Sequence, residues 1–342
     1  MKIYLGTMTF GWEQASSLVT NEVAREMIKV FSMFGYSNVD TAAIYTGGKC
    51  EGILANVLPV DYSLSPPLLI GTKAHPSLSS GFDNAGLSDQ FANSLSETKQ
   101  SSFEEYFLHQ PDSKQDVLPA LKFVNDLIHK GQVKHLGLSN YAAVECERIF
   151  ALCEEHQLHK PTRYQGLYNP LNRMVEEELL PLLKANGCSF VAYNPLAAGL
   201  LTGRHHRGGE VTEGRFKNNP NYLPRFYTEA NFEAVEQIEK ACAENGNISI
   251  IDATYRWMML HSALTEADGL LLGASSMSQL NMNLECVTDP QPLPADVLAA
   301  MNNVYSITKP GAFAYWRGYS KCMPNRLSLH QGADYVAKKK RS

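Results

Sequence analysis

The sequence predicts a (β/α)8 barrel, also called a TIM barrel, as its fold. Eight short β-rich runs alternate with longer segments of helical periodicity, and no low-complexity linker divides the 342 residues. Polar side chains gather at the ends of the β-rich runs. Strands that alternate with helices form a parallel sheet, and eight such repeats can close into a barrel. Because α/β barrels commonly exceed the usual domain length, one barrel accommodates this chain.

The expected strands are rich in aliphatic, aromatic and β-branched residues and are bounded by Gly, Pro or polar residues. They cover residues 2–7, 38–42, 67–73, 104–110, 133–140, 162–169, 188–195 and 269–275. A doubly wound sheet is the alternative α/β architecture. Its first turn would carry G-x-G-x-x-G for a dinucleotide, whereas "GTMTFGW" at residues 6–12 lacks that pattern. The barrel is therefore favoured.

The expected helices place apolar residues three or four positions apart, so that each has one apolar face. Two of them stop at Gly35 and Gly131, because glycine readily adopts the left-handed conformation that ends a helix. The clearest helical segments are residues 21–35, 116–132, 142–157 and 231–246.

The chain is expected to be one domain over residues 1–342, with the barrel over about 1–290. Residues from about 291 to 342 are expected to be a loop segment that returns over the barrel mouth, followed by a tail. The basic run "KKKRS" at residues 338–342 is interpreted as a solvated tail.

Composition narrows the class of protein. With 44% hydrophobic residues, 19% charged residues and a formal net charge of -5, the chain is a poor general nucleic-acid binder. No segment approaches the roughly 20 apolar residues that a membrane span requires. The seven cysteines include no Cys-x-x-Cys pair, which favours reduced thiols. We expect a cytoplasmic protein without a nucleic-acid or membrane partner.

Chemically useful side chains lie where the expected strands end. Asp40 ends the second run, Lys73 the third and His109 the fourth, and Tyr45 follows Asp40 by five residues. In a closed barrel these strand ends converge on one mouth, where barrel enzymes place their active sites. The other strand ends contribute Ser139 and Asn140, Gln165, Tyr193 and Asn194, and Ser275 and Ser276.

Together the first four side chains could form a proton-donating site. An ammonium group beside the Tyr45 phenol would lower the pKa of the phenol, and Asp40 would hold Lys73 in place. His109 could orient a carbonyl oxygen against the phenol. Proton donation needs a group that attacks the carbonyl carbon, and hydride from a nicotinamide cofactor fits. Taken singly, Asp40 could cap a helix, and Tyr45 and His109 could be packed core residues.

Three other chemistries are weaker interpretations. The adjacent His205 and His206 lack further ligands at suitable spacing, so they are interpreted as an exposed loop and no metal is expected. "GGKCEG" lacks the spacing of a phosphate-binding loop. A barrel acting on sugars would need two catalytic carboxylates, and Asp40 has no obvious second.

Seven strings occur in an order and spacing that resemble a known family. They are "NVDTAAIYTGGKCEG", "LLIGTKAHP", "YFLHQPD", "HLGLSNY", "YQGLYNP", "AYNPLAAGLLTG" and "GASSMSQLNMNL". Over about residues 1–320 the chain is similar to the aldo-keto reductase superfamily, most closely its aflatoxin-aldehyde and succinic-semialdehyde reductase branch. The resemblance implies NADPH-dependent reduction of aldehydes and reactive ketones, including carboxylate-bearing or aromatic aldehydes, by a monomer or homodimer.

The resemblance also implies residue roles. Tyr45 would be the general acid, Asp40 and Lys73 would tune it, and His109 would orient the carbonyl. The implied contacts to NADPH or NADP+ are Asp40, Ser139, Asn140, Gln165, Tyr193, Asn194, Leu196, Gly199, Leu201, Arg204, Arg215, Ser275, Ser276, Gln279 and Asn283. The implied substrate contacts are Trp12, His109, Arg225 and Arg317, in an apolar wall that includes Phe10, Trp12, Tyr222, Phe226 and Trp316.

Two positions depart from the family pattern. Many members have a basic residue at the position of Gln279 and an acid at the position of Met282. We still expect NADPH, because Arg215 could supply the positive charge. The alternative function is a nucleotide-sensing regulatory subunit that resembles potassium-channel beta subunits, although an intact set of Asp, Tyr, Lys and His argues against a passive role.

Overall fold

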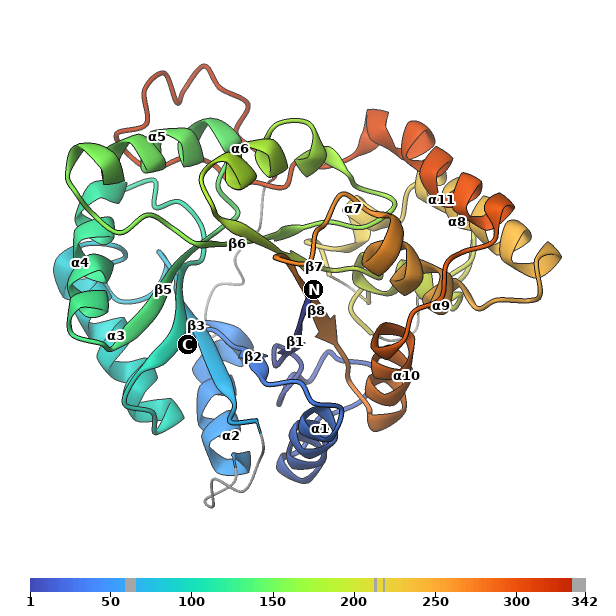
Figure 1. Ribbon diagram of the computed structural model, residues 1–342, viewed down its shortest axis with the longest axis horizontal. Helices are drawn as coiled ribbons and strands as arrows, with labels where there is room; N and C mark the ends of the chain where they lie inside the picture. The colour runs from blue at the N-terminus through green and yellow to red at the C-terminus, as the bar shows by residue number, and fades with distance from the viewer. Residues whose placement is uncertain (59–65, 212–213, 218, 334–342) are drawn as a thin grey trace.

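The computed structural model is a closed barrel of eight parallel strands that pair in sequence order, with β1 also paired to β8 (Figure 1). It describes residues 1–58, 66–211, 214–217 and 219–333. All eight predicted strands are confirmed. They are β1 (Lys2–Gly6), β2 (Asn38–Asp40), β3 (Leu69–Ala74), β4 (Phe103–Leu108), β5 (Val133–Ser139), β6 (Arg163–Leu167), β7 (Ser189–Tyr193) and β8 (Gly269–Gly273).

Helices surround the barrel (Figure 1), and the four predicted segments are among them. The Thr20 side chain accepts from Val23 N to begin α1, and Gly35, with φ +84°, follows its end. The helices are α1 (Asn21–Met33), α2 (Cys50–Val57), α3 (Asn84–Thr98), α4 (Val117–His129), α5 (Ala143–Glu155), α6 (Leu179–Ala185), α7 (Leu223–Phe226), α8 (Glu229–Glu244), α9 (Ile250–Arg256), α10 (Met277–Thr288) and α11 (Ala295–Thr308).

The barrel interior toward the N-terminal ends of the strands is filled by a hydrogen-bonded cluster. Glu105 of β4 accepts from the Tyr4 hydroxyl at 2.8 Å and from Arg163 Nε at 3.0 Å. Burial raises the pKa of Glu105, and these partners oppose that rise. Because side chains of the barrel fill its interior at the N-terminal ends of the strands, a ligand can bind only at the C-terminal ends.

The C-terminal segment is only partly the loop that was predicted. Residues Ala295–Thr308 form α11, which packs beside α8 in Figure 1, so the loop prediction is wrong there. Its periodic apolar positions, including the buried Val297 and Met301, are better satisfied by helix packing. Beyond α11 the chain does return to the mouth, where Arg317 N donates to Asn140 O at 2.9 Å. The predicted tail at 338–342 lies outside the described residues.

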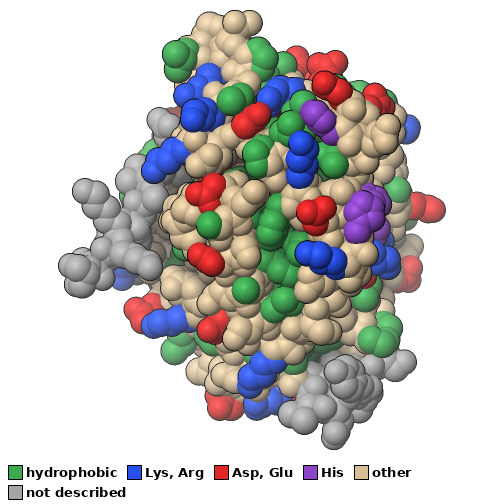
Figure 2. Space-filling view, turned by 90° about the vertical axis from the view of Figure 1, so that its left-hand side faces the viewer, with side chains coloured by type: hydrophobic (Ala, Val, Ile, Leu, Met, Phe, Trp, Pro, Cys, Tyr) green, Lys and Arg blue, Asp and Glu red, His purple; other side chains and the backbone are tan. Residues whose placement is uncertain are grey.

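The surface that carries α3 and α4 shows acidic and basic side chains interspersed around apolar ones (Figure 2). Neither sign of charge dominates this face, which is ordinary for a solvated surface. Among the described helices, none combines the length and the apolar character that crossing a bilayer requires.

Candidate active site

A cavity of about 920 Å3 opens at the C-terminal ends of the strands, at the upper end of the usual size range for small-molecule sites. It brings together most of the residues predicted from the sequence. Those lining it are Trp12, Asp40, Tyr45, His109, Ser139, Asn140, Gln165, Tyr193, Asn194, Leu196, Gly199, Arg204, Arg215, Ser275, Gln279, Asn283 and Arg317, together with Tyr222 of the expected apolar wall.

A buried ion pair lies at the floor of the cavity: Asp40 lines the wall, and Lys73 lies behind it and does not line the cavity. Lys73 of β3 is fully buried, and its Nζ donates to Asp40 Oδ1 at 2.5 Å and to Thr41 O at 2.7 Å. Gln165 of β6 donates through Nε2 to the same Asp40 oxygen at 2.8 Å. Asp40 and Lys73 come together because β2 and β3 are neighbouring parallel strands. The Asp40 carboxylate therefore fixes the ammonium in place, as the sequence predicted.

Tyr45 lies above this pair. The chain after β2 turns sharply, with Thr46 and Gly47 at φ +55° and +67°, and brings the Tyr45 ring to 5.1 Å from Lys73 Nζ. The expected net lowering of the Tyr45 pKa is wrong: the pKa lies well above its ordinary value, because burial and then the Asp40 charge disfavour a phenolate. The phenol is consequently protonated at neutral pH and can donate a hydrogen bond or a proton.

His109, at the end of β4, faces the phenol. Its ring meets that of Tyr45 edge-on, with centroids 5.7 Å apart. Burial, followed by the neighbouring His75, Lys73 and Arg317, holds the pKa of His109 well below its usual value, so the imidazole is neutral. Within the described residues its Nδ1 is buried without a hydrogen-bond partner. A neutral imidazole beside a protonated phenol can orient a carbonyl oxygen without adding charge.

His75 and Gln110 also line the cavity, and neither was predicted from the sequence. The His75 ring lies edge-on to His109 at 5.3 Å, and burial with the Arg317 charge lowers the pKa of His75 to about 4. Ser77 N donates to His75 Nδ1 at 3.1 Å, so the neutral ring carries its proton on Nε2. The sequence spacing could have indicated His75: it follows Lys73 by two residues, and side chains two positions apart along an extended strand point to the same face.

Several predicted contacts lie outside the cavity wall, because local packing directs them elsewhere. The Arg225 guanidinium stacks on the Phe313 ring at 5.3 Å, and Ser276 caps α10 by accepting from Gln279 N. The buried or inward-packed residues are Leu201, Phe10, Phe226 and Trp316. His205 lines the cavity and bonds Tyr227 at 2.5 Å, so its interpretation as an exposed loop residue is also wrong.

The chemistry of one side of the cavity suits a phosphate-bearing ligand. Arg215 donates to Asn194 Oδ1 at 2.9 Å, and its guanidinium lies between the rings of Trp12 and Tyr222, at 5.5 and 5.3 Å. Arg204 lines the same cavity. Guanidinium groups favour phosphate, both by charge and by their forked geometry. This side therefore fits the pyrophosphate of a dinucleotide.

The far end of the cavity is lined by neutral polar groups. Gln279 Oε1 accepts from Ser275 N at 2.8 Å, and Ser16 in the loop after β1 lies 2.7 Å from the Ser275 hydroxyl. Asn283 donates to Gly273 O at 3.2 Å. These hydroxyl and amide groups suit the sugar and base of an adenosine, whose polar atoms both donate and accept hydrogen bonds.

A barrel that holds a proton donor, a fixed ammonium and a cavity lined by apolar and polar side chains at its C-terminal face is an α/β-barrel enzyme. A sequence model described as "Aldo/keto reductase family" matches residues 2–306. The match spans most of the chain, so the chain belongs to the aldo/keto reductase family and is an oxidoreductase.

Individual relatives agree with that assignment. Aflatoxin B1 aldehyde reductase member 2 from Rattus norvegicus is 35% identical over 324 residues, 92% of this chain and 87% of the relative. Aldo-keto reductase family 7 member A3 from Homo sapiens is 35% identical over 300 residues, 84% of this chain and 90% of that protein. An aldo-keto reductase from Klebsiella pneumoniae, solved in complex with NADPH, shares the fold with a TM-score of 0.65 and 19% identity, covering 89% of this chain and 90% of that one.

Proposed function

We propose that this protein reduces aldehydes and reactive ketones to alcohols with NADPH, and that Tyr45 is the general acid. The observation that carries the proposal is the protonated Tyr45 phenol, which lies between a buried ammonium and a neutral imidazole at the cavity floor. Aldehyde reductases among the relatives support the reaction class. The cofactor named for the similar Klebsiella structure supports NADPH.

The cofactor would lie along the cavity. Ser139, Asn140 and Gln165 would hold the nicotinamide carboxamide, and Arg204 and Arg215 would neutralise the pyrophosphate. Tyr193, which donates to Asn140 Oδ1 at 2.9 Å, would flank the ring. The reduced nicotinamide supplies a hydride for the carbonyl carbon.

The protein's own residues would then complete the reduction. His109 orients the carbonyl oxygen toward the Tyr45 hydroxyl, and Tyr45 transfers its proton to that oxygen. The phenolate that this transfer creates is disfavoured by burial and by Asp40. Lys73, held at 5.1 Å from the ring, offsets that cost by attraction as the negative charge develops. In this mechanism Lys73 reduces the cost of forming the phenolate, while burial and Asp40 keep the phenol protonated at neutral pH.

The substrate is proposed to carry an aromatic or a carboxylate group. Trp12 and Tyr222 supply apolar surface in the cavity, and Arg317, which also lines it, supplies positive charge. Arg317 Nη1 donates to Gln110 Oε1 at 3.3 Å, which ties its side chain to the end of β4. A guanidinium held in this way suits a carboxylate. Arg225 is not part of this proposal.

The test is steady-state NADPH oxidation with 2-carboxybenzaldehyde, succinic semialdehyde and unsubstituted benzaldehyde. We expect the two acids to have higher kcat/KM than benzaldehyde. Tyr45→Phe should lower kcat by at least about 100-fold, the lower range for loss of a general acid, and should leave NADPH affinity within about threefold. Tight NADPH binding by the wild-type protein without turnover of any of these aldehydes would instead support the nucleotide-sensing alternative.

A further inference from the structure

A short turn directly after β6 connects the two loops that cover the cavity. In this Asn-Pro-Leu-Asn turn, residues 169–172, Asn169 and Asn172 form an isolated antiparallel bridge. Both asparagines are buried, at 0% and 4% exposure. The structure places neither of them in the cavity wall, so any influence on the reaction passes through other residues.

Asn169 holds the loop on the phosphate side. Its Oδ1 accepts from Leu171 N and Asn172 N and closes the turn, while its Nδ2 donates to Asn194 O at 3.0 Å. That same carbonyl accepts from Ala197 N at 2.9 Å. Asn194 is in the left-handed region, with φ +54°, and its side chain receives Arg215. The Asn169 amide therefore fixes the residue that holds Arg215.

The loop held in this way has an unusual backbone. Ala197, Ala198 and Gly199 follow one another with φ of +48°, +59° and +113°, and the first two are unfavourable for residues with a Cβ. Such a conformation persists only when surrounding contacts over-determine it. The hydrogen bonds that Asn169 Nδ2 and Ala197 N donate to the Asn194 carbonyl fix the beginning of this segment.

Asn172 holds the loop on the substrate side. Its Nδ2 donates to Phe313 O at 2.9 Å, and its Oδ1 accepts from Met174 N at 3.4 Å. Phe313 belongs to the segment that returns from α11 toward Arg317, and its ring packs against Arg225 and Phe226. The two asparagines of one turn thus serve two different loops.

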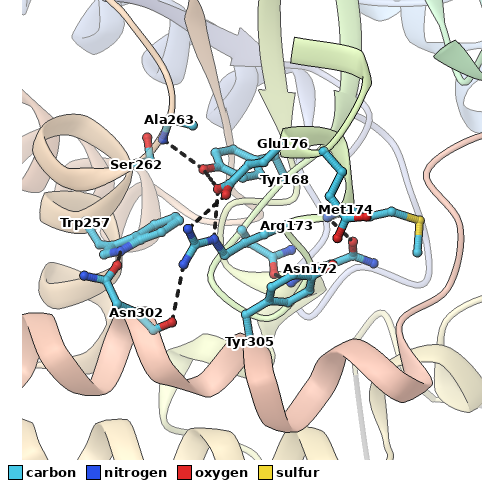
Figure 3. Close-up of polar contacts among 12 residues, drawn as sticks. Tyr168, Asn172, Arg173, Met174, Glu176, Trp257, Ser262, Ala263, Asn302 and Tyr305 are labelled. Atoms are coloured by element: carbon cyan, nitrogen blue, oxygen red, sulfur yellow. Dashed lines mark hydrogen bonds and ion pairs between the residues drawn. The ribbon is translucent and has the colours of Figure 1, made fainter. Parts of the chain in front are cut away.

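The turn is anchored from its other side by a polar cluster (Figure 3). Arg173 forms a two-pronged ion pair with Glu176, with both N–O distances 2.9 Å, and its guanidinium lies over the Trp257 ring at 5.3 Å. Glu176 also accepts from Tyr168 at 2.5 Å. The Trp257 indole bonds Asn302 of α11 at 3.0 Å. Because Arg173 is held by Glu176 and by the Trp257 ring, the turn that precedes it is a fixed support for the two loops.

We propose that Asn169 and Asn172 are positioning residues with separate effects. Asn169 sets the affinity for the cofactor through Asn194 and Arg215, and Asn172 sets the KM for the aldehyde through the segment from Phe313 to Arg317, of which Arg317 lines the cavity. The proposal rests on the proposed function. It requires that each loop respond to its own asparagine and not to the other.

The experiment compares Asn169→Asp and Asn172→Asp. Each substitution keeps the acceptor oxygen that closes the local turn and replaces the amide donor to the loop by a carboxyl oxygen, which repels the loop carbonyl when it is ionised. Asn125→Asp is the matched control, because Asn125 is also a buried amide that accepts from His159 N, at 3.0 Å, away from the cavity. Four quantities are measured for the wild type and for these three variants: the NADPH Kd by fluorescence, the aldehyde KM at saturating NADPH, the melting temperature and the rate of amide hydrogen exchange.

We expect Asn169→Asp to raise the NADPH Kd about tenfold, the change for one lost buried hydrogen bond, with the aldehyde KM within about twofold. Asn172→Asp should show the reverse pattern. Exchange without any ligand should rise in residues 194–203 for the first variant and in residues 309–317 for the second. In addition, Asn169→Asp combined with Arg215→Ala should weaken NADPH binding no more than Arg215→Ala does alone.

The proposal would be overturned if each variant raised the NADPH Kd and the aldehyde KM by the same factor. It would also be overturned if these changes were no larger than those of Asn125→Asp at a matched drop in melting temperature. So would loop exchange unchanged from the wild type. The exchange measurement requires no cofactor. If the wild-type protein neither binds nor oxidises NADPH, the proposed function fails, while the loop-specific exchange still reports on the two asparagines.

Discussion

Replacing Lys73 by Met tests the role of the buried ammonium most directly. Met retains much of the side-chain length and apolar stem but removes the charge 5.1 Å from the Tyr45 ring centroid. With an effective dielectric constant of about 20, a unit charge at that distance attracts a full phenolate charge by about 3 kcal/mol. At about 1.4 kcal/mol for each tenfold change in rate, kcat should fall roughly 200-fold.

The same substitution leaves Asp40 buried without its ammonium partner. Breaking a buried ion pair from one side typically costs about 3–5 kcal/mol of unfolding free energy. The double variant Asp40→Asn with Lys73→Met removes both charges, so it should recover most of the lost stability, measured by urea unfolding. Its kcat should remain low, since the phenolate still lacks a cation.

The assay is single-turnover reduction of 2-carboxybenzaldehyde, which separates the chemical step from product release. NADPH Kd is measured in parallel to show that the cofactor is bound. A folded Lys73→Met protein that keeps a single-turnover rate within about threefold of the wild type would refute the assigned role. In that case the phenolate charge would have to be stabilised by another group.

Two further predictions concern stability. Gly137→Ala should lower the unfolding free energy by about 1–3 kcal/mol, because an added Cβ would lie 2.2 Å from the Phe107 ring in the packed interior; an unchanged urea midpoint would contradict this. Burial, followed by the Arg163 charge, lowers the pKa of His135 to about 4. The unfolded chain therefore binds more protons between about pH 6.5 and 4, so the unfolding free energy should fall as pH falls through that window, and His135→Gln should flatten the profile.

The positions of the main site residues along the chain could be predicted from the amino-acid sequence. Asp40, Lys73 and His109 end successive strands, and parallel strands in a barrel bring their carboxyl ends together. The helices at 21–35 and 116–132 follow from apolar spacing and terminal glycines. A loop is predicted from residue 291, whereas residues 295–308 form α11, because packing beside α8 outweighs the weak local signal.

Local pattern by itself indicated the eight strands, the barrel fold and the polar residues at the strand ends, because side-chain periodicity and strand polarity are properties of neighbouring residues. The other expected cavity residues came from the family resemblance. Only the tertiary structure decided how those residues behave. The raised pKa of Tyr45 and the neutral state of His109 depend on burial and on charges from other strands. The placement of Arg225 against Phe313, and the ties from Asn169 and Asn172 to separate loops, depend on contacts between segments distant in sequence, which no local pattern encodes.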